Sequence, residues 1–274
     1  MASSAAPMRL TGARRSSLWA RQAIIVSVLG FLYVPIVVLL VFSFNQSYLS
    51  ALWTGFTFRW YQVLFQEPAL LHSLAVSLEV AVIQTIISTI LGTLGGIALH
   101  RYNFWGKKAL VYFLYVPIVI PEIVMAVALL IYLPHVGVPL GVPAMVIGQT
   151  TFTIPYVVLI VRASMAGFDT TLEEAARDLG ANELQTILRV TIPVILPGII
   201  VGALLSFSQS FDDFTTSFFV DGSGNTPLPV QIYGMLRHGV NPSVNALSTI
   251  IVVSTLVIVY TGQRAQRRRM KSQS

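Results

Sequence analysis

The stretch "EEAARDLGANELQTILRVTIPVILPGII", residues 173–200, joins a charged helix to an apolar one across a glycine. Its first part mixes acidic and basic residues with alanine, and its last part is apolar and contains Pro193 and Pro197. The apolar part predicts a membrane span, and the charged part predicts a polar element that leads directly into that span.

The rest of the chain has the composition of a membrane protein. Apolar residues make up 55% of the 274 residues and charged residues only 10%, which is not the balance of a soluble surface. Six apolar stretches reach the roughly 20 residues that a helix needs to cross the hydrocarbon core: residues 24–44, 73–99, 109–133, 142–161, 193–220 and 244–262. They lack the short alternating pattern of transmembrane β-strands. The sequence therefore predicts an all-α integral membrane protein with six transmembrane helices.

The distribution of positive charge predicts the orientation of the spans. With both termini in the cytoplasm, all 17 Lys and Arg residues except Arg59 and Arg237 lie on the cytoplasmic side, as the positive-inside rule requires. The expected organisation is a cytoplasmic tail at 1–23, a six-span domain at 24–263 with a cytoplasmic loop at 163–192, and a basic cytoplasmic tail at 264–274. Within the second span, Gly92 and Gly96 form a G-x-x-x-G pattern that predicts close approach of another helix.

The cytoplasmic loop between spans four and five carries two helix signals. Thr170 and Thr171 each precede a glutamate by three residues, which predicts a capping box, and Gly180 is placed as a C-terminal stop. Asn182, with Gln185 three residues later, predicts the cap of a second helix. Because this second helix continues into span five, any movement of the first helix would pass to a transmembrane segment.

The first of these helices has a narrow apolar stripe. Leu172, Ala175 with Ala176, and Leu179 recur at helical spacing beside a charged face. A helix of about two turns is marginal alone in water, so packing must hold it. The stripe either rests on lipid headgroups, as amphipathic surface helices do, or docks on another protein.

Ionisable residues inside the predicted spans are functional hypotheses, because a charge in hydrocarbon is costly. These residues are Glu79, Glu122, Asp212 and Asp213, and the span interiors contain no Lys or Arg. At about 1.5 Å per residue, the two glutamates lie at a similar level in the outer half and the aspartates near the outer mouth of span five. A buried carboxylate must protonate or bind a cation. The residues therefore predict an outer vestibule for a cation such as a diamine or triamine.

Details of this vestibule leave alternatives open. Phenylalanines at positions 207, 211, 214 and 218 form a stripe beside the aspartates. Phe211 and Phe214 either pack against other helices or make cation-π contacts with an alkylammonium group. Asp212 and Asp213 are about 100° apart on a continuous helix, so one of them is expected to face the path. Glu79 either lines the path or bonds to a neighbouring helix.

Motifs for catalysis and metal binding are absent from the sequence. The nearest approach to a phosphate-binding loop, at Gly106 and Lys107, has Arg101 where the first glycine belongs and Lys108 where Ser or Thr is needed. The four histidines lack metal-ligand spacing and there is no cysteine. We expect neither enzyme activity nor a cofactor or metal in this chain.

The charged loop resembles the "EAA" loop of permease subunits in ABC importers. Residues 174–176 are EAA, Gly180 follows at the family's spacing, and Val190, Ile192 and Pro193 close the pattern. Val190 replaces the usual isoleucine and Ile192 the usual leucine, and both changes are conservative. The resemblance extends over most of the chain, through "GFTFRWY" at 55–61, "SFDDF" at 210–214, "LPVQIY" at 228–233 and "GVNPSVNAL" at 239–247, to the PotC-type, spermidine and putrescine branch.

The resemblance implies a type I importer permease in a bacterial cytoplasmic (inner) membrane. In that family, the helix before the glycine docks into an ATPase subunit, which binds the ATP and Mg²⁺ and hydrolyses the nucleotide. The residues implied in this coupling are Leu172, Glu173, Glu174, Ala175, Ala176, Asp178, Leu179 and Gly180. The implied partners are a second, PotB-like permease, two copies of a PotA-like ATPase and a PotD-like binding protein outside the membrane.

Three alternatives differ in mechanism or cargo. The same importer role is compatible with another small solute, such as an opine or an amino-acid derivative. An ion-coupled carrier would use Glu122 or Asp212 to take up protons, but it has no need of an ATPase-docking loop. An intramembrane aspartyl hydrolase is disfavoured, because adjacent aspartates on one helix do not converge on one water.

Overall fold

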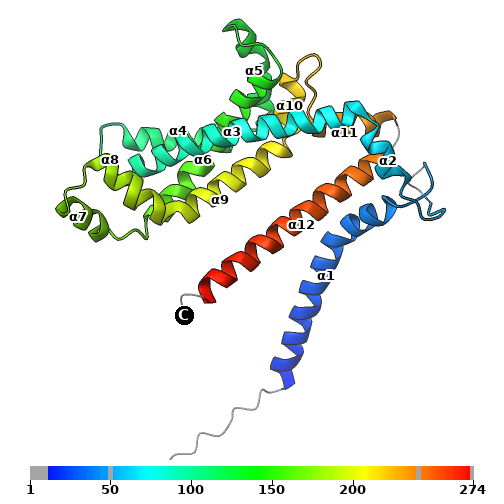
Figure 1. Cartoon of the computed structure of the whole chain (residues 1–274), viewed down its shortest axis with the longest axis horizontal. Helices are drawn as coiled ribbons and strands as arrows, with labels where there is room; N and C mark the ends of the chain where they lie inside the picture. The colour runs from blue at the N-terminus through cyan, green and yellow to red at the C-terminus, as the bar shows by residue number, and fades with distance from the viewer. Residues whose placement is uncertain (1–11, 49–51, 239–241, 272–274) are drawn as a thin grey trace, which may run out of the picture. The chain divides into compact units, whose positions relative to one another are not determined.

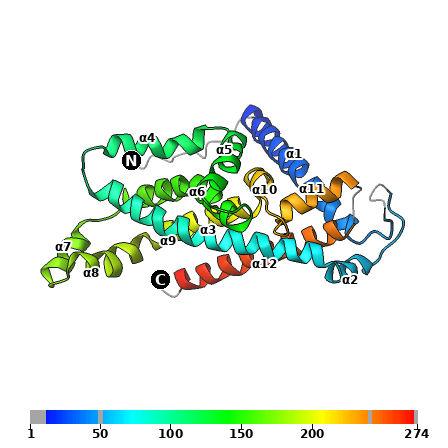
Figure 2. The same cartoon turned by 90° about the horizontal axis from the view of Figure 1, so that it is seen from above.

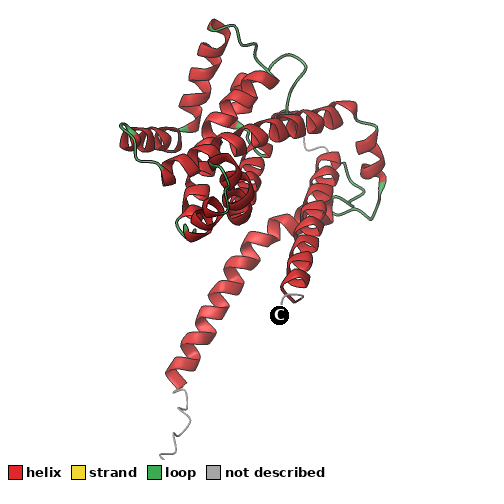
Figure 3. Ribbon diagram, turned by 60° about the vertical axis from the view of Figure 1, so that its left-hand side comes forward, coloured by secondary structure: helices red, strands yellow, loops and turns green. Residues whose placement is uncertain are grey.

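The computed structural model describes residues 12–48, 52–238 and 242–271, and these residues form helices joined by short loops (Figures 1 and 3). An isolated antiparallel bridge pairs Asn45 with Phe56, and no strand is present in the described ranges. This confirms the all-α fold class. The chain divides into two compact units, residues 1–67 with 238–274 and residues 68–237.

The first unit contains α1 (Gly12–Phe42), α2 (Arg59–Phe65) and α12 (Pro242–Lys271). The link between α1 and α2 is organised by Asn45, whose backbone carbonyl accepts a 2.7 Å hydrogen bond from the Trp60 indole. Phe44 stacks on Phe56 beside it. Helix α1 starts at Gly12, so it includes part of the predicted N-terminal tail, and α12 likewise runs into the predicted C-terminal tail. Residues 1–11 and 272–274 of these tails lie outside the described residues.

The second unit is built on three long helices that pack together: α3 (Pro68–Arg101), α6 (Val142–Met165) and α9 (Ile192–Phe211) (Figures 1 and 2). The contact of α3 with α6 uses the predicted G-x-x-x-G pair. A Cβ atom on Gly92 would lie 2.5 Å from Cβ of Val157, and one on Gly96 would lie 2.8 Å from Cβ of Val161. The two glycines therefore allow a backbone approach that no larger residue permits.

Gly92→Ala tests this packing. The added Cβ meets the Cβ of Val157, which cannot move without its backbone, so we expect a loss of about 1–3 kcal/mol of stability. Gly30→Ala in α1 is the matched control, because nothing lies within 4 Å of its Cβ position and alanine favours a helix. The unfolding midpoint of the purified chain in detergent should fall for Gly92→Ala and not for Gly30→Ala. Equal midpoints would contradict the packing.

The third predicted span is not one continuous helix. Helices α4 (Lys107–Val119) and α5 (Glu122–His135) are bent by 99° at Ile120 and Pro121. Ile120 is extended, with φ −68° and ψ 132°, as the residue before a proline prefers. The expectation of one straight helix is therefore wrong, because Glu122 begins α5 at the break, and the depth of Glu122 in the membrane stays a prediction.

The fifth predicted span is also shorter than expected. Helix α9 ends at Phe211, and a separate short helix, α10 (Thr215–Val220), follows before α11 (Leu228–His238). Asp212 and Asp213 lie in the link between α9 and α10. The prediction of one helix over residues 193–220 is wrong, because the chain leaves the helix after Phe211 and starts a new one at Thr215.

Four helices of the described residues are long and apolar enough to cross a membrane, or five if α4 and α5 are one broken span. They are Arg21–Phe42 within α1, Pro68–Arg101, Val142–Met165 and Glu183–Phe211. The sixth predicted span falls on α12, where Pro242–Val257 is a shorter apolar helix. The chain is a multi-pass membrane protein, and the count of six spans stays a prediction.

The charged loop forms α7 (Thr171–Asp178), α8 (Glu183–Thr186) and a π-helical turn, η1 (Ile187–Thr191), that continues into α9. Figures 1 and 2 both place α7 and α8 at the end of the second unit, beyond the start of α9. Gly180 ends α7 with φ +88°, a left-handed conformation that glycine adopts without strain. The predicted element of two helices with a glycine turn is thus present.

Candidate functional site

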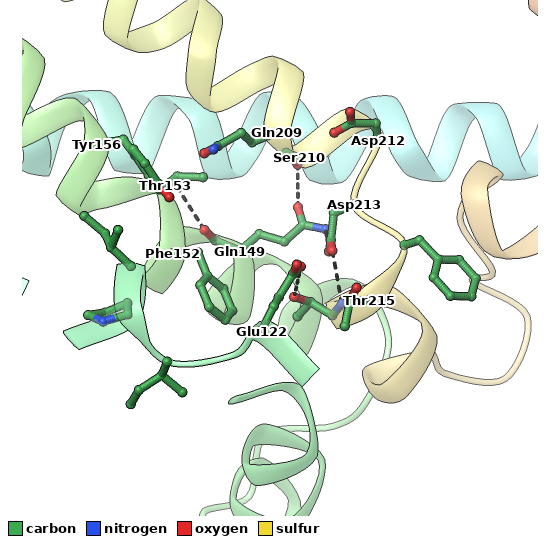
Figure 4. A pocket seen from close by; sticks show the side chains of 15 residues that line it. Glu122, Gln149, Phe152, Thr153, Tyr156, Gln209, Ser210, Asp212, Asp213 and Thr215 are labelled. Carbon is green, nitrogen blue, oxygen red and sulfur yellow. Dashed lines mark hydrogen bonds between the residues drawn. The ribbon is translucent and has the colours of Figure 1, made fainter. Parts of the chain in front are cut away.

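A cavity of about 470 Å³ opens where three segments of the second unit meet (Figure 4). These segments are the α4–α5 break, the middle of α6 and the α9–α10 link. The lining residues are Pro117, Ile118, Ile120, Glu122, Gln149, Phe152, Thr153, Tyr156, Gln209, Ser210, Asp212, Asp213, Phe214, Thr215 and Thr216. Both helix breaks therefore contribute to one site.

Three of the four carboxylates predicted for the vestibule line this cavity. Glu122 comes from the start of α5, and Asp212 and Asp213 come from the link between α9 and α10. Because the helix ends at Phe211, both aspartates line the cavity, and which of them faces the path stays a prediction. Glu79 is exposed on α3 and is not a lining residue. The carboxylates of the cavity therefore come from two segments, the start of α5 and the α9–α10 link.

Asp213 is held in place by hydrogen bonds from α6 and α10. Its Oδ2 accepts a 2.7 Å bond from the amide of Gln149. Its Oδ1 accepts from the backbone N–H of Thr216 at 3.0 Å, and its Oδ2 from that of Ser217 at 3.2 Å. A carboxylate at a helix start satisfies otherwise unpaired N–H groups. Asp213 therefore fixes the start of α10 and faces the cavity at the same time.

Glu122 lies beside this cluster, where the Thr216 hydroxyl is 3.5 Å from its Oε1. Figure 4 shows Glu122, Gln149 and Asp213 directed toward one another, with Asp212 nearby. The lining residues include these three carboxylates and no Lys, Arg or His. A cavity whose carboxylates have no cationic side chain among the lining residues favours a bound cation.

The predicted phenylalanine stripe is broken by the same link. Phe207 stacks on Phe211 in α9, with ring centroids 6.0 Å apart. Phe214 packs on Phe218 and on Tyr233 of α11, at 5.3 Å and 4.9 Å. Phe214 lines the cavity and Phe211 does not. The ring contact of Phe211 is thus within its own helix, and its role stays a prediction, whereas Phe214 packs on α11 and also borders the cavity.

Sequence reasoning missed the polar residues that join the cavity to the helix core. Gln149 accepts a hydrogen bond from the Ser210 hydroxyl as well as binding Asp213. Gln84, fully buried in α3, donates to the Ser206 carbonyl at 2.8 Å and accepts from Thr153 at 3.0 Å. The signal was the presence of glutamines inside the apolar spans, at 84, 149 and 209, because a buried amide needs several partners.

Helix α7 exposes its apolar stripe on the surface of the chain. Leu172 is 46% exposed and Leu179 is 90% exposed, while Glu173 is only 7% exposed. Ala175 and Glu174 are exposed as well, and Ala176 is partly buried. The apolar stripe is therefore not packed against the rest of the chain. Helix α7 is instead anchored by the buried contacts of Glu173.

The caps of this element differ in part from expectation. Neither threonine box forms; instead Asp169 accepts hydrogen bonds from the Thr171 hydroxyl at 2.8 Å and the Thr171 N–H at 3.0 Å. These bonds lower the pKa of Asp169. The box of Asn182 with Gln185 is confirmed at the start of α8. Tyr102, whose hydroxyl donates to Glu183, has a raised pKa for that reason.

Comparison with known proteins identifies the family. The family described as "Binding-protein-dependent transport system inner membrane component" matches residues 88–272. The chain belongs to this family. The permease is 38% identical over 251 residues to "Spermidine/putrescine transport system permease protein PotC" of Escherichia coli (strain K12), covering 92% of this chain and 95% of the relative. It is 33% identical over 261 residues to the same organism's "Putrescine transport system permease protein PotI", covering 90% and 93%.

Solved structures share the fold of this permease. A chain of a bacterial ABC transporter for import of the acidic polysaccharide alginate aligns with a TM-score of 0.70 at 17% identity, over 96% of this chain and 99% of that chain. A chain of the MetNI methionine ABC transporter aligns with a TM-score of 0.55 at 21% identity, over 77% and 98%. The permease therefore has the fold of ABC importer permeases.

Proposed function

We propose that this permease is the subunit through which an ATP-driven importer moves spermidine or putrescine into the cytoplasm. The observation that carries the proposal is the cavity lined by Glu122, Asp212 and Asp213 without a lysine, arginine or histidine. Polyamines carry two or more ammonium groups along a flexible chain, so several carboxylates in one cavity match their charge. The names of the similar permeases support the same cargo.

The aromatic lining suits the same ligand class. Phe152, Tyr156 and Phe214 border the cavity beside the carboxylates. An alkylammonium group over an aromatic face gains about 0.5–2 kcal/mol where water is excluded, and the methylene groups between the amines bury apolar surface. A neutral or acidic solute would leave the carboxylates uncompensated, which costs free energy in a partly buried site.

The assembly follows from what the chain lacks and what it exposes. The permease has no phosphate-binding loop of its own, so ATP, Mg²⁺ and hydrolysis belong to a partner ATPase, present in two copies. The exposed face of α7, with Leu172, Glu174 and Leu179, is the proposed docking surface for one copy. A PotB-like second permease completes the pathway as a heterodimer, and a PotD-like binding protein delivers the solute.

The orientation proposed from the sequence fits these roles. With both termini in the cytoplasm of a bacterial cell, α7 and α8 face the ATPase across the inner membrane from the binding protein. The cavity then lies in the membrane domain between the two. ATP-driven movement of α7 passes through α8 and η1 into α9, whose far end carries Asp212 and Asp213.

Solute-stimulated ATP hydrolysis tests the cargo. The permease is co-purified with its second permease and ATPase, reconstituted in nanodiscs, and assayed with its binding protein and a panel of solutes. We expect spermidine or putrescine to raise the ATPase rate several-fold, and neutral or anionic solutes of similar length to leave it at the basal rate. If an opine or an amino-acid derivative stimulates and polyamines do not, the argument from the carboxylate cavity is wrong.

A further inference from the structure

Glu173 joins three separate segments at the cytoplasmic end of the second unit. Its Oε2 accepts a hydrogen bond from the guanidinium of Arg101 at the end of α3. Its Oε1 accepts a 2.5 Å bond from the hydroxyl of Thr191, in η1 at the start of α9. A single side chain of α7 is thus bonded to both α3 and α9.

This contact is not an ordinary surface ion pair. The side chains of Arg101 and Glu173 are 13% and 9% exposed, so the solvent and salt screening that weakens exposed pairs is reduced. Arg177 lies one helical turn from Glu173, but it is half-exposed and its nitrogen is 3.8 Å away. Arg101 is therefore the principal cationic partner of Glu173 among the described residues.

A second bond runs parallel to the first. The hydroxyl of Tyr102, the residue after Arg101, donates to Glu183 at the start of α8. Consecutive residues at the end of α3 therefore hold both helices of the charged loop. Movement of α7 or α8 relative to α3 would have to break these bonds.

The two helices held by Glu173 also meet deeper in the unit. The side-chain amide of Gln84 in α3 donates to the backbone carbonyl of Ser206 in α9 at 2.8 Å. The Ser206 hydroxyl donates to the side-chain oxygen of Gln84 at 3.2 Å. Helices α3 and α9 are thus bonded to each other near the cavity and to α7 at the cytoplasmic end. An α9 that moved alone would have to break both sets of contacts.

We infer that Arg101 and Glu173 are a positioning pair that makes α3 and α9 move together when α7 is displaced. The inference deepens the proposed function, on which it rests, and it separates Glu173 from its neighbour Glu174. Glu174 faces outward as part of the docking surface, whereas Glu173 faces inward and transmits the movement. Without the pair, the ATPase should stay bound and hydrolyse ATP, but less solute should be transported for each ATP hydrolysed.

Transport per ATP hydrolysed is the first test. In proteoliposomes with the full importer, Glu173→Gln and Arg101→Gln should retain the ATPase subunit and lower the solute moved per ATP about fivefold or more. The double variant that exchanges the charges, Arg101→Glu with Glu173→Arg, should recover part of the lost solute transport per ATP. Lys108→Gln is the matched control, because Lys108 is an exposed cytoplasmic cation outside the pair. An unchanged ratio in both single variants, or no recovery in the exchange, would overturn the inference.

Distance measurement on the permease alone is the second test. The natural sequence has no cysteine, so spin labels are placed on cysteines introduced at His100 and Asp178, both exposed. The distribution of label distances should be narrow with Glu173 present and broad with Glu173→Gln, and identical distributions would overturn the inference. If the wild-type importer shows no solute-stimulated hydrolysis, the proposed function fails, but this measurement still decides whether the pair holds α7.

Discussion

Glu174→Lys should abolish solute uptake while the permease stays folded in the membrane. Glu174 lies on the exposed face of α7 beside Leu172, where an acidic side chain can pair with cations of the ATPase. Reversing its charge places like charges together, so we expect retention of the ATPase on the affinity-tagged permease to fall at least about tenfold. Co-purification followed by quantitation of the ATPase subunit measures the effect.

Two further variants control this result. Glu174→Gln removes the charge without reversing it, so its loss of ATPase should be smaller than that of Glu174→Lys. Gly180→Asn keeps a residue that tolerates the left-handed conformation of the turn, so it should retain the ATPase better than Gly180→Val. Full retention of the ATPase by Glu174→Lys, with normal uptake, would rule out the docking role of α7.

Neutralising the carboxylates of the cavity should produce the second large effect. Asp213→Asn and Glu122→Gln keep side-chain size but remove the negative charge from a cavity without cationic side chains. A hydrogen bond to a charged group contributes about 1.5–3 kcal/mol, so we expect each change to raise the KM for polyamine uptake by about 10-fold to 100-fold. Uptake of labelled spermidine or putrescine by the full importer measures this.

Glu79→Gln is the matched comparison for the cavity variants. From the sequence, Glu79 either lines the path or bonds to a neighbouring helix, and the structure places it on an exposed face of α3, outside the cavity lining. We therefore expect the KM for polyamine uptake by the Glu79→Gln importer to stay within about twofold of the wild-type value. A change of this size is smaller than the loss of one hydrogen bond to a charged group would cause. An increase in KM for Glu79→Gln equal to that for Asp213→Asn would show that the path is not confined to this cavity.

The membrane fold and the charged loop were predictable because they depend on local patterns. Long apolar stretches can be buried only in lipid or in a helix core. Gly180 has φ +88°, a backbone conformation that most other residues adopt only with strain. The box of Asn182 with Gln185 depends on residues three apart and was also predicted correctly. In each case the interaction that decides the structure lies within a few residues.

The errors arose where tertiary contacts decide between local alternatives. Proline is tolerated inside a membrane helix, and the sequence did not show that the chain would bend by 99° at Pro121. Helix α9 ends at Phe211, and Asp213 in the following link accepts hydrogen bonds from the start of α10 and from Gln149 of α6. The cap before α7 is a different case, because Asp169 bonds Thr171 only two residues later and replaces the predicted threonine boxes. The contact of Gln149 with Asp213, by contrast, is not visible from the spacing of the residues.

The burial of Glu173 is the least predictable feature of the site. On a helical wheel it belongs to the charged face, and only the distant Arg101 and Thr191 turn it inward. The apolar stripe of α7 is left exposed as a result. A surface that is apolar by pattern and exposed in the isolated chain indicates a partner, and this is the link between the fold and the proposed assembly.

The most direct test of the account is uptake of labelled spermidine or putrescine by sealed proteoliposomes that contain the whole importer. The ATPase side is supplied with ATP, the opposite side holds the binding protein and solute, and the proton gradient is set independently. Uptake should require hydrolysable ATP and the ATPase subunits, and it should persist when the proton gradient is dissipated. Uptake that continues without the ATPase subunits and collapses with the proton gradient would contradict it.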